Sequence, residues 1–213
     1  IGFSGAPFTL ASYAIEGGSS RNYAQTKTLM YTFPDLWHKL MDTLAQAVGH
    51  YLKAQVDAGV QVLQIFDSWA GALSPADYEA YVLPYSQKAV ALARVDNDVP
   101  IIHFSTSTTG LLPSIRSIGA DVIGLDWRVD LADTWASLGN DVAVQGNLDP
   151  LVLFAPIPEI KKQVARILDS VNNQPGYIFN LGHGILPQTP VDHVKALVDF
   201  VHEYSESKQV DNE

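Results

Sequence analysis

The chain has 213 residues, 47% of them hydrophobic and 17% charged, with no cysteine and a formal net charge of −10. This composition predicts a folded domain with a substantial core, and it excludes disulfides, thiolate catalysis and metal sites with cysteine ligands. The acidic charge argues against nucleic acid as a partner. Because no apolar run reaches the roughly 18 residues of a membrane span and no signal peptide is recognisable, we expect a cytoplasmic protein without membrane contact.

Six short apolar segments follow one another along the chain, and a segment with helical spacing follows each of them. They comprise residues 1–3, 60–66, 100–104, 121–125, 142–145 and 177–181. Short runs rich in Val and Ile and bounded by turn residues are typical of parallel strands buried on both faces. The first run coincides with the first residues of the chain, so we expect part of the protein to precede it.

The longest helix is predicted over residues 34–58, where an apolar residue recurs every four positions. These positions are Leu36, Leu40, Leu44, Val48 and Leu52. Ser74 and Thr189 each precede a proline and are expected to cap the helix that follows. Residues 205–213 are expected to form a frayed tail. No interior stretch resembles a linker, so residues 1–213 are interpreted as a single domain.

Strand–helix alternation repeated six times predicts an α/β fold. Two architectures are compatible with it, an open doubly wound sheet and a (β/α)8 TIM barrel. A barrel takes about 250 residues for eight units, so six units fit a barrel that lacks roughly two N-terminal units. No G-x-G-x-x-G follows the first strand, which weakens the dinucleotide-binding alternative. We therefore predict an incomplete (β/α)8 TIM barrel.

The loops that follow the predicted strands carry the chemistry-bearing residues, as the C-terminal strand ends of a barrel do. They read SGAPFTLASYAIEGG, FDSWAG, HFSTSTTG, LDWRVD, QGNLDP and NLGHG. In the last of them Gly182 and Gly184 flank His183, which permits the backbone to approach a ligand closely. Polar groups that converge on one mouth are the default hypothesis for a binding site, and we place His183 there.

Some residues in these loops also have an ordinary structural explanation. Asp126 and Asp149 are explained by capping of the following turn, and Trp69 and Trp127 by packing. His103 is as easily a core histidine as a site residue.

No metal or nucleophile site is indicated by the motifs. The chain contains no H-x-x-H, H-E-x-x-H or paired-carboxylate spacing, so we assign no metal. Ser68 lies in FDSWAG rather than in a G-x-S-x-G elbow, so a serine triad has no support. For Tyr13, which lies on a helical stretch, the ordinary explanation is a core tyrosine whose hydroxyl is hydrogen-bonded.

Five of these motifs together resemble the bacterial uroporphyrinogen decarboxylase family in order and approximate spacing, over essentially the whole chain. The motifs are GFSGAPFTLASYAIEGG, FDSWAGALSP, GLDWRVD, QGNLDP and FNLGHGILPQTP. The resemblance implies a (β/α)8 barrel, usually a homodimer. It also implies removal of four acetate carboxylates from uroporphyrinogen III, without a cofactor, to give coproporphyrinogen III.

Carried over by motif, the resemblance implies that Tyr13, Ser68 and His183 contact the substrate and act in catalysis, and that Phe66 lines the cleft. Hydroxyl and imidazole groups suit carboxylates, and decarboxylation needs positioning and electrostatic stabilisation of a protonated pyrrole. The family's catalytic aspartate and arginine-rich segment lie upstream of these motifs. Arg21 and Arg128 alone look insufficient for eight carboxylates, so we expect a C-terminal portion of the enzyme, inactive by itself.

Two alternatives remain open. A methyltransferase of the cobalamin- or methionine-synthase type shares the barrel but holds zinc with His and Cys, and this chain has no cysteine. The other alternative is a structural remnant without activity, able at most to dimerise or to bind a porphyrin.

Overall fold

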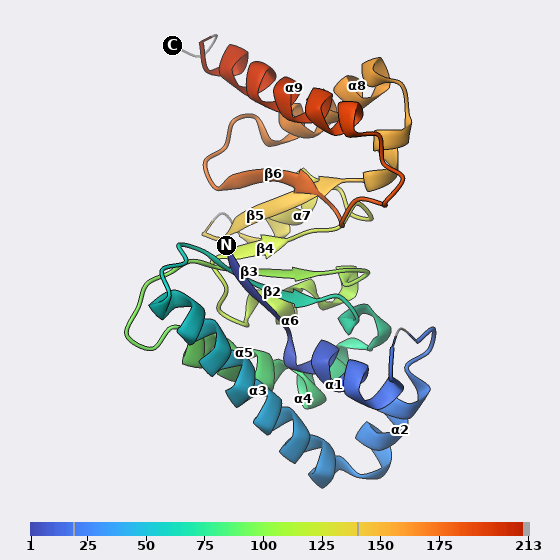
Figure 1. The fold of residues 1–213 in the computed structure, drawn as a ribbon, viewed down its shortest axis with the longest axis vertical. Coiled ribbons are helices and arrows are strands. Elements are labelled where there is room, and N and C mark those ends of the chain that lie inside the picture. Colours follow the sequence, from blue (N-terminus) through green and yellow to red (C-terminus); the bar gives the residue numbers. More distant parts are fainter. Residues whose placement is uncertain (19, 140, 211–213) are drawn as a thin grey trace. The chain divides into compact units, whose positions relative to one another are not determined.

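The computed structural model describes residues 1–18, 20–139 and 141–210, and in it strands alternate with helices along the chain (Figure 1). The contacts group the residues into two compact units, Ile1–Ile123 and Gly124–Glu213. The single domain predicted from the sequence therefore stays a prediction. Among the described residues, no helix combines the length and the hydrophobicity that a membrane span requires.

The first unit contains three parallel strands that are neighbours in chain order. They are β1 (Gly2–Gly5), β2 (Leu63–Asp67) and β3 (Ile101–Ser105). Gly2 is paired with Leu63, and Ile65 with His103. Consecutive parallel neighbours are what successive βα units of a barrel produce.

Helices connect these strands and cover them. They are α1 (Pro7–Glu16), α2 (Ala24–Thr32), α3 (Pro34–Asp57), α4 (Pro75–Tyr81), α5 (Leu83–Ala93) and α6 (Leu112–Arg116), with short 3-10 turns η1 (Ala70–Ala72) and η2 (Thr109–Leu111). Proline begins α1, α3 and α4, a position where its missing N–H costs nothing. The predicted cap of α4 is confirmed, since Ser74 Oγ accepts from the Asp77 N–H at 3.2 Å.

The buried face of α3 follows only part of the four-residue repeat of apolar residues. Leu36 is 55% exposed, and the buried side chains are Trp37, Met41, Ala45, Val48 and Leu52. A repeat of four residues advances 40° further than one helical turn at each step, so it drifts around a helix with about 3.6 residues per turn. The predicted helix is therefore confirmed, and of the five repeated positions Val48 and Leu52 lie on its buried face.

The second unit follows β4 (Val122–Gly124), which lies at the boundary between the units. Its elements are α7 (Leu131–Leu138), β5 (Ala143–Leu148), η3 (Pro150–Phe154), α8 (Ile157–Val171), β6 (Tyr177–Leu181) and α9 (Val191–Val210). β5 and β6 are parallel neighbours, with Val144 paired to Tyr177 and Leu148 to Leu181. α8 and α9 pack side by side (Figure 1).

The C-terminal end of the chain differs from the prediction in two places. α9 continues to Val210, so residues 205–210 are helical rather than a frayed tail, and residues 211–213 lie outside the described residues. The hydroxyl of Thr189, expected to cap this helix, is buried and makes no hydrogen bond with the described residues.

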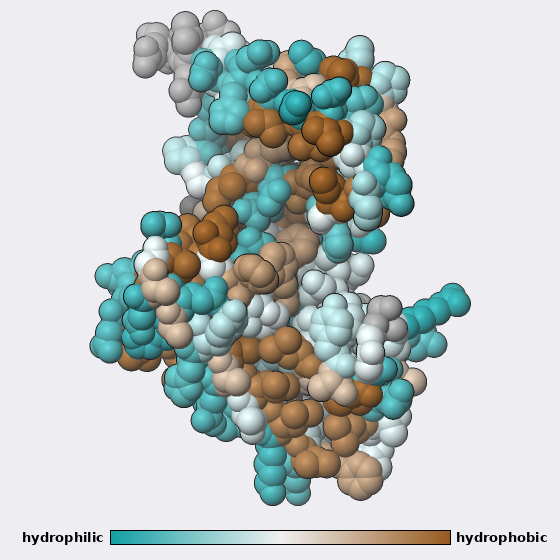
Figure 2. Space-filling view, in the orientation of Figure 1, coloured by the Kyte–Doolittle hydropathy of each residue, from teal (hydrophilic) through white to brown (hydrophobic). Residues whose placement is uncertain are grey.

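Six strands that alternate with helices, in chain order within each unit, confirm the α/β fold and are consistent with an incomplete (β/α)8 barrel. A doubly wound sheet would instead reverse its strand order at a switch point. Figure 2 shows apolar surface over α1 and α3 of the first unit, where Phe33 and Leu36 are exposed.

Candidate active site

Tyr13 and Ser68 both adjoin Trp69 in the first unit. Tyr13 lies near the end of α1 and is 51% exposed, and its ring packs against Trp69 with the two centroids 3.9 Å apart. Ser68 precedes Trp69 directly and is half-buried. Tyr13 is therefore not the buried core tyrosine of the ordinary explanation, and its side chain is open to solvent.

A cavity of about 300 Å³ opens beside these residues. It is lined by Arg21, Tyr23, Ser68, Trp69, Gly71, Ala72, Thr106 and Ser107. The lining combines one guanidinium, hydroxyl groups and two aromatic rings, which suits an anionic ligand with a flat apolar body. Tyr13 is not one of these lining residues, but its ring contacts Trp69, which is.

The loop after β3 contacts the loop after β2, and residues of both loops line this cavity. Thr106 Oγ1 donates to the Ser68 carbonyl at 2.8 Å. A Cβ added to Gly71 would lie 2.4 Å from the Thr106 carbonyl oxygen, so only glycine permits this approach. The backbone of Ser68 is thus fixed by a neighbouring loop rather than by its own strand alone.

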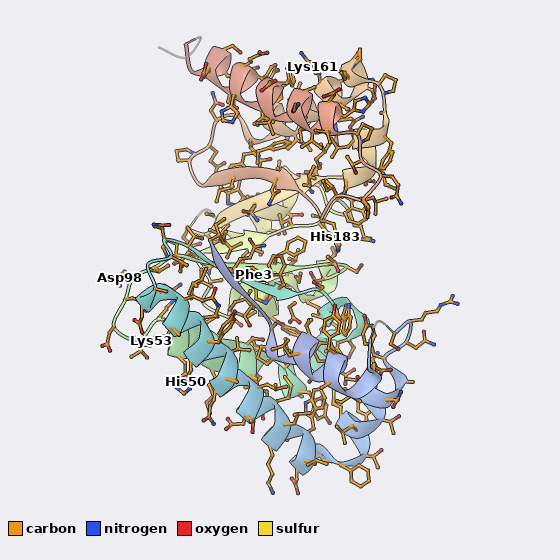
Figure 3. The ribbon with its side chains drawn as sticks, viewed as in Figure 1. Phe3, His50, Lys53, Asp98, Lys161 and His183 are labelled. Carbon is orange, nitrogen blue, oxygen red and sulfur yellow. The ribbon has the colours of Figure 1, made fainter. Side chains whose placement is uncertain are left out.

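Phe66 lies on the face of β2 opposite to Asp67, because successive side chains of a strand alternate. Its ring makes edge contacts with Phe3 and Phe104, each with centroids 6.0 Å apart. Phe3, on β1, is 61% exposed (Figure 3). These three rings form an apolar surface on this face of the sheet.

No role was predicted for Asp67. Its side chain is fully buried, and its Oδ1 accepts from Thr9 Oγ1 of α1 at 2.9 Å. Burial raises the pKa of Asp67 to about 7, against a smaller lowering by the Thr9 hydrogen bond. The pair joins the helix that carries Tyr13 to the strand end that carries Ser68. The signal available in the sequence was a carboxylate at the end of an otherwise apolar strand.

His103 is fully buried in the first unit, and neither ring nitrogen has a hydrogen-bond partner among the described residues. Burial lowers the pKa of His103 to about 4. The side chain is therefore neutral at pH 7, which favours the core interpretation over a site role.

His183 lies in the second unit, in the loop between β6 and α9 (Figure 3). Its ring meets Trp127 edge to face, with centroids 6.4 Å apart. A Cβ on Gly182 would lie 2.6 Å from the Trp127 backbone nitrogen. The glycine before His183 is therefore required by a close approach to the loop after β4.

That loop holds an ion pair. Asp126 is 5% exposed, and its Oδ2 accepts from Arg128 Nη1 at 2.8 Å while its Oδ1 accepts from the Arg128 backbone N–H at 2.9 Å. The turn-capping explanation of Asp126 is thus correct but incomplete. Asp149 also caps as that explanation has it, accepting from the Leu151 N–H at 2.9 Å.

Asn147 of β5 supports the same loop. Its side-chain amide donates to the carbonyls of Asp126 and Val129 at 3.0 and 2.9 Å. The asparagine of QGNLDP thus acts on the loop backbone in this structure.

The structure accordingly assigns the predicted residues to two sets of contacts. Tyr13 and Ser68 adjoin Trp69 in the first unit, and His183 adjoins Trp127 in the second. Among residues 1–18, 20–139 and 141–210, no three His, Asp or Glu side chains form a group able to hold a metal ion. The absence of a metal stays a prediction.

Comparisons with known proteins place the chain in a family. Residues 1–204 match the family model described as Uroporphyrinogen decarboxylase (URO-D). The uroporphyrinogen decarboxylase of Roseiflexus sp. (strain RS-1) is 56% identical over 209 residues, which are 96% of this chain and 60% of that protein. That of Chloroflexus aurantiacus (strain ATCC 29366 / DSM 635 / J-10-fl) is 58% identical over 207 residues, 96% of this chain and 58% of that protein.

Among solved structures, a methyltransferase from Methanosarcina mazei has a TM-score of 0.81 at 21% identity, covering 95% of this chain and 58% of that one. At this identity the likeness shows a shared fold alone. The chain spans 60% and 58% of the length of the two curated relatives. With its motifs at the strand ends and a family model that matches residues 1–204, the chain belongs to the uroporphyrinogen decarboxylase family.

Proposed function

We propose that the protein containing this chain removes the acetate carboxylates of uroporphyrinogen III to give coproporphyrinogen III, without a cofactor. The observation that carries the proposal is the family match over residues 1–204, together with relatives of 56% and 58% identity that bear this name. The methyltransferase alternative has no comparable support, because its structural likeness extends to the fold only.

The contacts around Trp69 support roles for Tyr13 and Ser68 in this reaction. Loss of carbon dioxide leaves an electron pair that a pyrrole protonated at a ring carbon accepts. The protein must then hold anionic carboxylates and a cationic ring in one geometry, which is a task of positioning and electrostatics. The exposed Tyr13 side chain and Ser68 at the cavity wall offer hydroxyl groups that can donate to carboxylates.

The proposal also gives His183 and Phe66 roles in binding the substrate. His183 would donate to a carboxylate, with its ring packed against Trp127. Phe66, with Phe3 and Phe104, would offer an apolar surface to the flat macrocycle. Assembly as a homodimer and a cytoplasmic location, both usual for the family, belong to the same proposal.

The test is decarboxylation of uroporphyrinogen III under anaerobic conditions by the full-length gene product. Tyr13→Phe, Ser68→Ala and His183→Ala should each lower kcat/KM by about 10- to 100-fold, because each loses a hydrogen bond to a charged group. The control is Thr43→Ala on α3, whose hydroxyl donates to the Lys39 carbonyl of its own helix. A wild-type protein that releases no carbon dioxide would contradict the function, and three variants with wild-type rates would contradict the residue assignments.

A further inference from the structure

The loop after β4 holds one arginine in a fixed conformation. Both carboxylate oxygens of the buried Asp126 accept from Arg128, one from its backbone and one from its guanidinium. The guanidinium carbon lies 4.0 Å from the ring centroid of Trp127, so the group is also stacked on the indole. An arginine fixed by both a carboxylate and an aromatic face loses little further freedom when it binds a ligand.

Part of this guanidinium faces solvent. The Arg128 side chain is 45% exposed, and its bond to Asp126 is made through Nη1. A guanidinium carries five N–H groups in a planar fork, of which one pair matches the two oxygens of a carboxylate. The group therefore retains donor capacity after its internal ion pair is satisfied.

Arg128 and His183 share Trp127 as a neighbour. The indole stacks with the guanidinium and meets the imidazole edge to face with centroids 6.4 Å apart. Gly182 brings the His183 loop against the Trp127 backbone. Two side chains with nitrogen donors, from loops far apart in sequence, thus border one aromatic ring.

Two other arginines, Arg94 and Arg166, lie on or at the end of helices and bond to side chains of this chain. Arg94 pairs with Asp121 at 2.7 Å at the end of α5, and Arg166 donates to Gln163 within α8. Arg128 instead lies in the loop that directly follows a strand, where a barrel carries its ligands. The guanidinium of Arg128, stacked on Trp127 in this loop rather than fully solvated, indicates a site for an anionic ligand.

We propose that Arg128, held by Asp126 and stacked on Trp127, forms with His183 a subsite for one carboxylate of the tetrapyrrole substrate. This inference rests on the proposed function and deepens it, because it assigns a second carboxylate donor beside His183. Arg128 is a binding residue in this proposal and takes no part in proton transfer.

The experiment uses the full-length protein with Arg128→Gln and the double variant Asp126→Asn/Arg128→Gln. The double variant leaves no unpaired buried carboxylate, and the introduced amide oxygen can still accept from the backbone N–H of position 128, so it guards against a folding defect. The matched control is Lys162→Gln, which removes one positive charge from α8, where Lys162 is 76% exposed. KM and kcat for uroporphyrinogen III and the Kd for uroporphyrin III, from fluorescence quenching, are measured at two salt concentrations.

We expect KM and Kd to rise about tenfold in both Arg128 variants, since a charge-assisted hydrogen bond is lost, while kcat changes less than about twofold. Lys162→Gln should match the wild type in all three. Wild-type KM and Kd in the folded double variant would overturn the subsite, as would a loss confined to kcat. Failure of the proposed function is a separate result, because it would appear as a wild-type protein without turnover.

Discussion

Burial shifts the pKa values of two ionisable side chains inside the first unit in opposite directions. The pKa of Asp67 is raised to about 7 and that of His103 is lowered to about 4, in both cases because burial penalises the charged form. Tyr78 faces the same region, and burial, followed by the Asp67 charge, raises its pKa well above its usual value, so it stays neutral. A rise in pH therefore lowers stability through Asp67, whereas a fall in pH lowers it through His103.

Replacing Asp67 with Asn should make the full-length protein more stable relative to wild type as the pH rises from about 4 to 7. A folded pKa above the unfolded value gives stability that is complete below about pH 4 and is lost as the pH rises through about 7. Asn cannot ionise and still accepts from Thr9. Relative to wild type, the free energy of unfolding of the variant should increase by on the order of 4 kcal/mol over this pH range, from about 1.4 kcal/mol per pKa unit.

The measurement is urea unfolding at about pH 4.5, 6 and 7.5. In the Asp67→Asn variant the opposite slope of His103 should emerge, with stability lost as the pH falls from about 6.5 towards 4, because its folded pKa is the lower one. The control is Asp98→Asn, an exposed carboxylate before β3 (Figure 3). Parallel pH curves for Asp67→Asn and wild type would contradict this account.

At the scale of elements, three strands end beyond their apolar runs. β2 and β3 end at Asp67 and Ser105, and β5 continues to Leu148, each beyond the end predicted from hydrophobicity. The backbone ladder continues as long as a neighbour pairs with it, whatever the side chain. Polar residues expected in loops, such as Asn147, are therefore held on the rigid strands.

The packing of α3 against α5 depends on Gly49. A Cβ there would lie 2.5 Å from the Leu92 Cβ and 3.1 Å from the Ala89 carbonyl oxygen. Gly49→Ala should destabilise the protein by about 1–3 kcal/mol through overpacking, even though Ala favours a helix by about 1 kcal/mol.

Chemical denaturation of Gly49→Ala and of Gly110→Ala tests this prediction. A Cβ on Gly110 meets no atom within 4 Å, so this control should stay within about 0.5 kcal/mol of wild type. An increase in stability for Gly49→Ala would show that the two helices can separate without cost.

At the scale of the whole molecule, charge and length bear on the proposed activity. The formal net charge is −10, with 13 Lys and Arg against 23 Asp and Glu. The chain spans 60% and 58% of the length of its two compared relatives. The octa-anionic substrate of the proposed function would be repelled by such a surface unless cations were concentrated at the site.

A polypeptide of these 213 residues, prepared by itself, should therefore decarboxylate uroporphyrinogen at least about 100-fold more slowly than the full-length gene product. Removal of preorganised charges costs factors of this size. Coproporphyrinogen formed per minute under anaerobic conditions is the measurement. Comparable turnover would show that these residues contain every essential group.

The sequence by itself determined the α/β class, six strands and a helix over residues 34–58, which the structure ends at Asp57, because periodicity and turn residues act over a few neighbouring positions. Its loop motifs also predicted the family, since they stand in register along the chain. The roles of Tyr13, Ser68 and His183 followed from those motifs and stay predictions.

Only the tertiary structure decided which residues meet across long separations. Thr9 and Asp67 are 58 residues apart and bond in the interior, and Trp127 joins Arg128 to His183. The exposure of Leu36 and the burial of Trp37 depend on which neighbours α3 packs against. Desolvation, close approach and stacking arise between segments that local patterns cannot relate, so the ionisation of Asp67 and the fixed guanidinium of Arg128 appear only in the folded chain.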